Sequence, residues 1–258
     1  VTDETYNVQI TSIVGGVAKG VKVYTGATTG ANDTITVSST TAGLVYAFAG
    51  DDTITGASGQ DTIYGGTGAD VMTGGGAADY LYGEAGDDIF KFASGAELNF
   101  DATIEGGANN DTIQFTAAST DITDDDFARV VTVEKLTLAD GTNTVVLGTT
   151  AKASFAALTL TGGTGADSIT LTSYNEDATI VSGGGADSIV GSAQADTVQF
   201  TTGDQLAAAT TVEGNGGTDV IHLTTADTTI VDADFTDVAE FETLTLTGAS
   251  SAVLGSNA

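Results

Sequence analysis

Residues 65–73 read Gly65-Gly66-Thr67-Gly68-Ala69-Asp70-Val71-Met72-Thr73. This pattern, a glycine-rich stretch that ends in aspartate and is followed two positions later by a bulky apolar residue, repeats every nine residues. Its aspartates in five successive units are Asp52, Asp61, Asp70, Asp79 and Asp88. A short period of this kind indicates a solenoid, in which each repeat stacks on the next. We therefore expect stacked turns and short strands over residues 47–91.

Glycine and aspartate in this order are suited to calcium, which takes about six to eight oxygen ligands from carboxylates and carbonyls. Glycine permits positive φ angles, which let the backbone point its carbonyls inward. If two units make one coil, Asp70 stacks between Asp52 and Asp88 at a strand spacing of about 4.8 Å. Carboxylates this close repel each other by roughly 1 kcal/mol in water and more near a protein surface. The repeat region is therefore predicted to need several Ca²⁺ ions and to be disordered without them.

The predicted calcium ligands are the aspartates that keep the nine-residue step and the glycines before them. They are Asp52, Asp61, Asp70, Asp79, Asp88, Asp187, Asp196, Gly50, Gly56, Gly59, Gly65, Gly66, Gly68, Gly74, Gly83 and Gly86. Four further candidates lack an aspartate two repeats away, so that ligation and ordinary turn formation both remain open for them. They are Asp33, Asp111, Asp167 and Asp219. In one unit Ala77 replaces a glycine, which puts the geometry of that turn in question.

These residues resemble the calcium-binding nonapeptides of the RTX (repeats-in-toxin) family, over less than a fifth of the chain. The resemblance implies an all-β fold, a right-handed parallel β-helix or β-roll solenoid with calcium-binding Gly-Asp turns. It also implies type I secretion, with export of an unfolded chain that folds where calcium is abundant.

A duplication extends beyond the nonapeptides. One constant shift along the sequence pairs Asp79 with Asp187 and Glu134 with Glu242. We expect one continuous solenoid over residues 1–258, with a first repeat unit at 21–148, which contains the nonapeptide run, and a second, shorter copy at 149–258. The chain begins at Val1 and shows no signal peptide, which predicts a piece of a longer protein.

Composition excludes several classes of function. The formal net charge is −29, and the six Lys and Arg residues are scattered, which argues against nucleic acid as a partner. No apolar run is long enough for a membrane span. The chain has no cysteine and a single histidine, His222, so that neither a thiol nucleophile nor a site of several histidines can form. We expect a protein that is not an enzyme.

The mixture of degenerate nonapeptides with Thr-rich segments resembles calcium-dependent surface-layer proteins of Gram-negative bacteria. We therefore expect an extracellular structural protein of the cell surface, whose partners are calcium and other copies of itself, with surface polysaccharide as a further candidate. Two alternatives remain: a segment of a large secreted adhesin or matrix filament, and the secretion and folding module of an exported hydrolase or toxin.

Overall fold

The computed structural model describes residues 5–8, 21–24, 30–37, 42–226, 230–248 and 252–253. Val1 and Ala258, the ends of the predicted solenoid, lie outside these ranges. The chain divides into two compact units. The first contains Val1–Phe92, Ala96–Gln114 and Asp126–Glu134, and the second contains Ala93–Gly95, Phe115–Asp125 and Lys135–Ala258.

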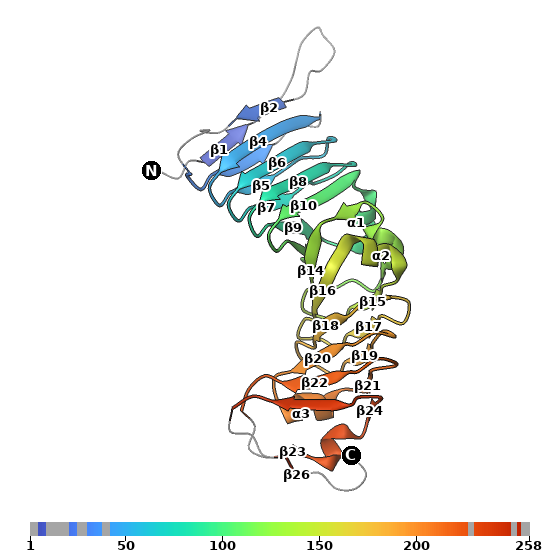
Figure 1. The fold of residues 1–258 in the computed structure, drawn as a ribbon. Helices are drawn as coiled ribbons and strands as arrows, with labels where there is room; N and C mark the ends of the chain where they lie inside the picture. Colours follow the sequence, from blue (N-terminus) through green and yellow to red (C-terminus); the bar gives the residue numbers. More distant parts are fainter. Residues whose placement is uncertain are drawn as a thin grey trace. The chain divides into compact units, whose positions relative to one another are not determined.

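The first unit is built from two parallel sheets whose strands alternate along the chain (Figure 1). One sheet has the order β1 (Thr5–Val8), β3 (Thr34–Val37), β5 (Thr53–Thr55), β7 (Val71–Thr73), β9 (Ile89–Phe92) and β11 (Thr112–Phe115). The other has the order β2 (Val21–Tyr24), β4 (Gly43–Ala49), β6 (Thr62–Thr67), β8 (Tyr80–Ala85), β10 (Thr103–Ala108) and β13 (Val130–Val131). Each coil therefore contributes one strand to each sheet.

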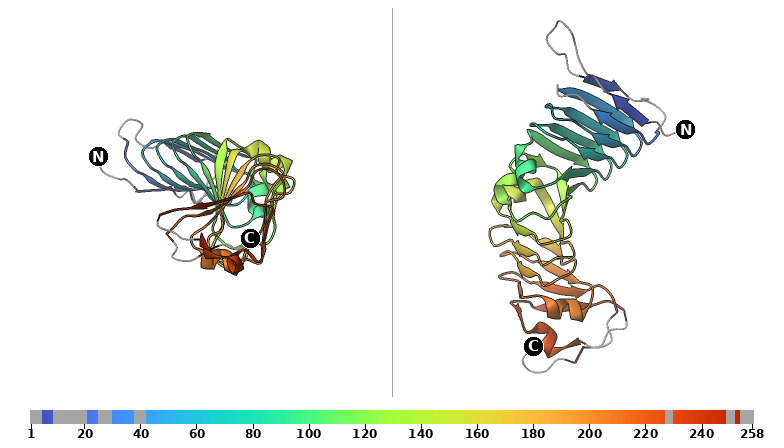
Figure 2. Two further views of the ribbon diagram at one scale, coloured as in Figure 1. Left: turned by 60° about the horizontal axis from the view of Figure 1, so that its bottom comes forward. Right: turned by 180° about the vertical axis from the view of Figure 1, so that it is seen from behind.

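The second unit follows the same plan. One sheet contains β16 (Phe155–Thr161), β18 (Ala178–Val181), β20 (Thr197–Phe200), β22 (Val220–Leu223) and β25 (Thr243–Leu246). The other contains β12 (Ile122–Thr123), β15 (Thr144–Val146), β17 (Ser168–Thr170), β19 (Ser188–Val190), β21 (Thr211–Glu213) and β24 (Val238–Ala239). A small pair consists of β23 (Ile230–Val231) and β26 (Ala252–Val253). The strands of this unit stack as rungs in the right-hand view of Figure 2.

The remaining elements in the part of the chain that the structure describes are β14 (Val133–Thr137), which has residues in both units, and five short helices. The α-helices are α1 (Gly95–Phe100), α2 (Thr149–Ser154) and α3 (Gly203–Ala208), and the 3-10 helices are η1 (Asp124–Phe127) and η2 (Asp232–Phe235). Both α1 and η1 recur further along the chain as α3 and η2, at the same shift that pairs Asp79 with Asp187. No helix in the described ranges is long and apolar enough to cross a membrane.

The predicted fold class is confirmed: the chain is mostly β, with long parallel sheets of the β-roll or β-helix type. Successive coils are in register, so that Ile54, Met72 and Phe90 align on neighbouring strands. All three side chains are buried, while the residues beside them in each strand are more exposed. The apolar residue two positions after each aspartate therefore builds the core, because strand residues alternate between the two faces of a sheet.

The outer face of the sheet that contains β4, β6 and β8 carries a stack of tyrosine rings. The ring centroids of Tyr46 and Tyr64 are 4.7 Å apart, and those of Tyr64 and Tyr82 are 4.8 Å apart. Their planes are nearly parallel, at 3° and 10°. This separation equals the spacing of hydrogen-bonded strands, so the rings stack because the coils are in register.

Phe90 and Phe100 allow a matched test of the core. Phe90 is fully buried and Phe100 is 61% exposed. We expect Phe90→Ala to lower the free energy of unfolding in calcium by about 3–5 kcal/mol. Phe100→Ala should lower it by less than about 1 kcal/mol. Urea unfolding followed by circular dichroism measures both, and equal losses would contradict the assignment of Phe90 to the core.

Candidate metal centre

The stacked turns of the first unit are joined by aspartate side chains. Oδ1 of Asp70 accepts the backbone N–H of Asp52 at 2.8 Å, and Oδ1 of Asp88 accepts the N–H of Asp70 at 2.8 Å. This first ladder extends in the same manner to Asp33, Asp111 and Glu134. A second ladder, beside the other sheet, contains Gly43, Asp61, Asp79 and Asp101. The predicted stacking of aspartates two repeats apart is therefore confirmed.

The second unit has two ladders of the same construction. One contains Ser119, Asn143, Asp167 and Asp187. The other contains Ala178, Asp196, Asp219 and Glu242. In each case the carboxylate or amide oxygen of one coil accepts the backbone N–H of the coil before it.

The four aspartates that lack a partner at two repeats have partners at other spacings. Asp33 bonds to Asp52 at a separation of 19 residues, and Asp167 bonds to Asp187 at 20. Asp111 and Asp219 each lie 23 residues from the ladder aspartate before them. The coils differ in length because some contain insertions, such as α1 between Asp88 and Asp111. A search at fixed spacing therefore misses these pairs.

Four residues whose side chains accept a ladder hydrogen bond were not among the predicted ligands: Asp101, Glu134, Asn143 and Glu242. The sequence contained one signal for them. Glu134 and Glu242 correspond under the long duplication, and each stands 23 residues after a ladder aspartate. Nothing in the nonapeptide pattern points to Asp101 or Asn143.

The second carboxylate oxygen distinguishes the aspartates from one another. Oδ2 is buried and has no hydrogen-bond partner in Asp52, Asp70, Asp79, Asp88, Asp111 and Asp219. These side chains are at most 1% exposed. A buried polar atom without a partner is costly, and buried polar groups are normally satisfied. The six unsatisfied oxygens therefore indicate that a ligand binds at these turns.

Glycines leave room for these oxygens. The position that a Cβ would take on Gly65 overlaps with Oδ2 of Asp70 and lies 3.0 Å from the carbonyl oxygen of Gly83, one coil further on. A carboxylate and a carbonyl oxygen thus face the same space. Equivalent glycines precede Asp61, Asp79 and Asp88 by five residues; they are Gly56, Gly74 and Gly83.

The other predicted glycines form the rest of the turn. Gly50, Gly68 and Gly86 stack with φ of 130°, 127° and 142°, and a Cβ on Gly68 would overlap with the carbonyl of Gly50. Only glycine adopts this conformation without strain. Gly66 also has a positive φ, and Gly59 is buried in the turn before Asp61.

Ala77 keeps the left-handed conformation, with φ of 78°. The turn that departs from the glycine pattern is therefore formed, at the cost of backbone strain that a residue with a Cβ carries in this region.

Burial raises the pKa of the ladder aspartates. The pKa of Asp70 is raised to about 8, first by burial and then by the charges of Asp88 and Asp52, against the hydrogen bond from Asp52. Burial also raises the pKa of Asp79 to about 7 and that of Asp88 to about 6. Without a counterion these turns favour the protonated form.

One comparison with known proteins identifies the turns. A family model described as "RTX calcium-binding nonapeptide repeat (4 copies)" matches residues 44–63, 64–96 and 174–204. The chain carries RTX calcium-binding nonapeptide repeats. RTX nonapeptides bind Ca²⁺, and proteins that contain them are typically secreted or extracellular. No curated protein and no solved structure matches the chain.

The RTX turns fit a calcium ion. The unpartnered Oδ2 atoms are hard oxygens, which calcium prefers as ligands. Those of Asp70, Asp88, Asp111 and Asp219 face the same space as a backbone carbonyl oxygen. Within the described ranges no three acidic or histidine side chains are grouped so that they could hold a metal. Backbone carbonyl oxygens such as that of Gly83 would supply part of the shell. A bound calcium would supply the positive charge that the stacked carboxylates lack.

At four other predicted turns the second oxygen already has a partner, and three of these turns lie within the RTX matches. Oδ2 of Asp61 accepts the N–H of Ala57 at 2.9 Å, and Oδ2 of Asp196 accepts that of Ser192 at 2.6 Å. Oδ2 of Asp167 accepts the N–H of Gly163, and Oδ2 of Asp187 accepts the hydroxyl of Ser182. Ligation by these four aspartates stays a prediction.

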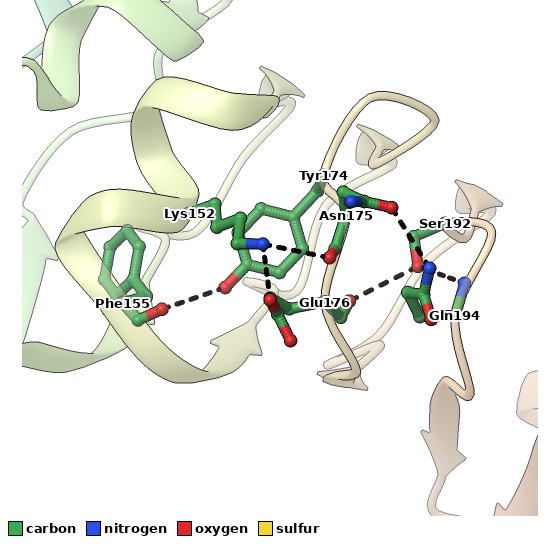
Figure 3. Close-up of polar contacts among 7 residues, drawn as sticks. All are labelled: Lys152, Phe155, Tyr174, Asn175, Glu176, Ser192 and Gln194. Carbon is green, nitrogen blue, oxygen red and sulfur yellow. Dashed lines mark hydrogen bonds and ion pairs between the residues drawn. The ribbon is translucent and has the colours of Figure 1, made fainter.

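One turn within the third RTX match is closed by a lysine and a tyrosine. Figure 3 shows Lys152 paired with the Glu176 carboxylate and donating to the Asn175 carbonyl. Tyr174 is fully buried and its hydroxyl donates to the Phe155 carbonyl at 3.3 Å. Burial and the Glu176 charge raise the pKa of Tyr174 to about 12, so that its hydroxyl stays a donor.

Ser192 and Gln194 hold this turn against the next coil (Figure 3). The hydroxyl of Ser192 donates to the Glu176 carbonyl at 3.3 Å, and the amide of Gln194 donates to Oδ1 of Asn175 at 3.0 Å. Side chains thus order this turn without the Gly-Asp arrangement.

Removal of calcium should loosen the first unit before the second. We expect a chelator at neutral pH to abolish hydrogen-exchange protection in β5–β9, where unpartnered carboxylate oxygens stack. Protection in β17 and β19 should decrease less, because the adjoining ladder of Asn143, Asp167 and Asp187 is closed by hydrogen bonds. Equal protection of β5–β9 with and without calcium would contradict calcium-coupled folding.

The calcium-free protein should be more stable in acid. The folded pKa of Asp70 is about 8, above the ordinary value of 3.8. Its protonated form is therefore favoured by folding, and this contribution is present below about pH 4 and lost as the pH rises towards 8. We expect the strand signal of metal-free protein to increase from about pH 8 to about pH 5.

Asp70→Asn is the control for this pH dependence, because asparagine does not titrate. The variant should show a weaker change of strand signal with pH than the wild type. A metal-free wild type that loses strand as the pH falls over this range would contradict the assignment.

Proposed function

We propose that the chain is a calcium-dependent structural protein of a bacterial cell-surface layer, and that its copies assemble into an extracellular lattice. The proposal rests on the two roles of the acidic side chains, which join adjacent coils and leave oxygens for a cation. The ladder aspartates hold adjacent coils together through Oδ1, as Asp70 and Asp88 do. In six of them Oδ2 is left for a cation. The ladder aspartates thus have a structural role, because they join the coils of the solenoid.

Calcium would restrict folding and assembly to the outside of the cell, where its concentration is high. The chain has a formal net charge of −29, so that copies repel one another. Bound cations lower this charge as they order the coils. Extracellular calcium modules bind at roughly 10⁻⁴ to 10⁻³ M, which favours a loose chain inside the cell and a compact one outside. A chain that is loose inside the cell suits type I secretion, which exports an unfolded chain.

The stacked tyrosines offer an aromatic contact face. Tyr46, Tyr64 and Tyr82 are only partly buried, and they stand in one row on the outer side of β4, β6 and β8. Tyrosines are enriched at protein interfaces because they combine apolar area with a hydroxyl. Another copy of the chain or a surface polysaccharide could contact this row.

We also propose that this chain acts as a scaffold and not as an enzyme. Its single histidine, His222, contacts the hydroxyl of Thr247 through Nε2 at 2.9 Å. The sequence contains no cysteine. Apart from Asp126 in η1, the carboxylates that are buried in the described ranges belong to the ladders, which supports a structural role for them.

A spacer in a large secreted adhesin or matrix filament is favoured by a different observation. The helices α1 and η1 recur as α3 and η2, so the chain repeats a unit much longer than a nonapeptide. Arrays of such units form extended rods. A secretion module of an exported hydrolase or toxin is the remaining alternative.

Assembly is tested by stripping the protein with a chelator and adding millimolar calcium. We expect sheets with regular symmetry in negative-stain electron microscopy, and none with magnesium at the same concentration, which controls for charge screening. Fibres would favour the filament. Compact, dispersed monomers in calcium would contradict self-assembly and leave the spacer or secretion module.

A further inference from the structure

Two buried aspartates outside the RTX matches have the same surroundings. Asp111 and Asp219 are 0% and 1% exposed. Oδ1 of Asp111 accepts the N–H of Asp88 at 2.8 Å, and Oδ1 of Asp219 accepts that of Asp196 at 2.7 Å. In both residues Oδ2 is buried and has no partner. Each side chain is thus fixed by one oxygen and presents the other to its turn.

In the first unit, a backbone carbonyl faces the unpartnered oxygen of Asp111. The position that a Cβ would take on Gly106 lies 2.5 Å from Oδ2 of Asp111 and also overlaps with the carbonyl oxygen of Thr132. Oε2 of Glu134 accepts the backbone N–H of Asp111 at 2.8 Å. A carboxylate and a carbonyl therefore meet where Gly106 leaves room, and the carboxylate of Glu134 is bonded to the backbone of the same turn.

The second unit repeats this arrangement. A Cβ on Gly214 would lie 2.6 Å from Oδ2 of Asp219 and would overlap with the carbonyl oxygen of Glu240. Oε2 of Glu242 accepts the N–H of Asp219 at 2.8 Å. The members of both groups correspond under the long duplication of the sequence.

The residues that supply the carbonyls differ from those of an RTX turn. Thr132 and Glu240 stand where the preceding coils have a glycine, and their φ angles are 52° and 60°. A β-branched residue such as threonine rarely adopts this conformation. Both units nevertheless have a residue with a positive φ angle at the position that supplies the carbonyl.

We propose that the turn of Asp111, Thr132 and Glu134 and its copy of Asp219, Glu240 and Glu242 each bind a calcium ion, in sites that are not built from two nonapeptides. The ligands are hard oxygens, which suit calcium and magnesium. Calcium fits better, because it accepts irregular shells in which carbonyls take part, whereas magnesium demands near-octahedral geometry. Each site closes a ladder that passes through an RTX match.

The chain contains its own example of a metal-free ladder position. Oδ1 of Asn143 accepts the N–H of Ser119 at 3.0 Å, as an aspartate would. Its Nδ2 donates to the carbonyls of Ala139 and Gly141 at 2.8 and 3.1 Å. An asparagine amide can thus contact carbonyls in a turn without a cation. Asp→Asn is therefore a substitution that the ladder tolerates.

Native mass spectrometry of the whole chain in calcium counts bound ions as integers. We expect Asp111→Asn to bind one calcium fewer than the wild type, and Asp111→Asn with Asp219→Asn to bind two fewer. The matched control is Asp87→Asn with Asp177→Asn, which removes the same charge from two exposed residues that also bond to a neighbouring coil. The control should bind as many ions as the wild type.

An unchanged ion count in the double variant would overturn the proposal, and so would an equal loss in the control. Circular dichroism in calcium checks that the variants keep the wild-type strand content. If they do not, Glu134→Gln with Glu242→Gln decides, because glutamine keeps the acceptor and loses the charge. Two ions should then dissociate at higher calcium than in the wild type, and an identical titration would overturn the proposal.

Discussion

Each ladder aspartate has two oxygens in different environments, and the structure depends on the bond made by the first. Oδ1 of Asp70 accepts the backbone N–H of Asp52, which fixes the distance between two coils and orients the carboxylate. Oδ2 is then held in a dry turn without a partner. The bond that joins the coils thus creates the demand for a cation, because a buried charge without a partner is costly.

The same bond tolerates coils of unequal length. It requires only that a carboxylate reach the backbone N–H of the coil before it, and residues between two turns can be added without changing that contact. Helix α1 is inserted between Asp88 and Asp111, and the two remain bonded at a separation of 23 residues. Glutamate replaces aspartate at Glu134 and Glu242. Solenoids accept such insertions because each coil contacts only its neighbours.

Differences among the turns set the calcium requirement along the chain. In the first unit the second oxygens of Asp52, Asp70 and Asp88 stack without partners. In the second unit the hydroxyl of Ser182 satisfies Asp187, and the amide of Asn143 donates to the turn carbonyls. Neutral donors here satisfy oxygens of the kind that the first unit leaves for a cation. One short repeat can therefore yield turns in which a carboxylate oxygen has no partner and turns in which a neutral donor satisfies it.

The sequence by itself determined the solenoid, the in-register apolar column and the Gly-Asp turns, because a nine-residue period fixes which residues stack. The partners of Asp33, Asp111, Asp167 and Asp219 came only from the tertiary structure, since coils of unequal length remove the constant spacing. The tertiary structure alone also revealed that Asp124 caps α2. The carboxylate of Asp124 accepts three backbone N–H groups about one coil away. Contacts between residues at a constant spacing can be predicted from the repeat. Contacts between coils that contain insertions depend on the path of the inserted residues, which the repeat does not determine.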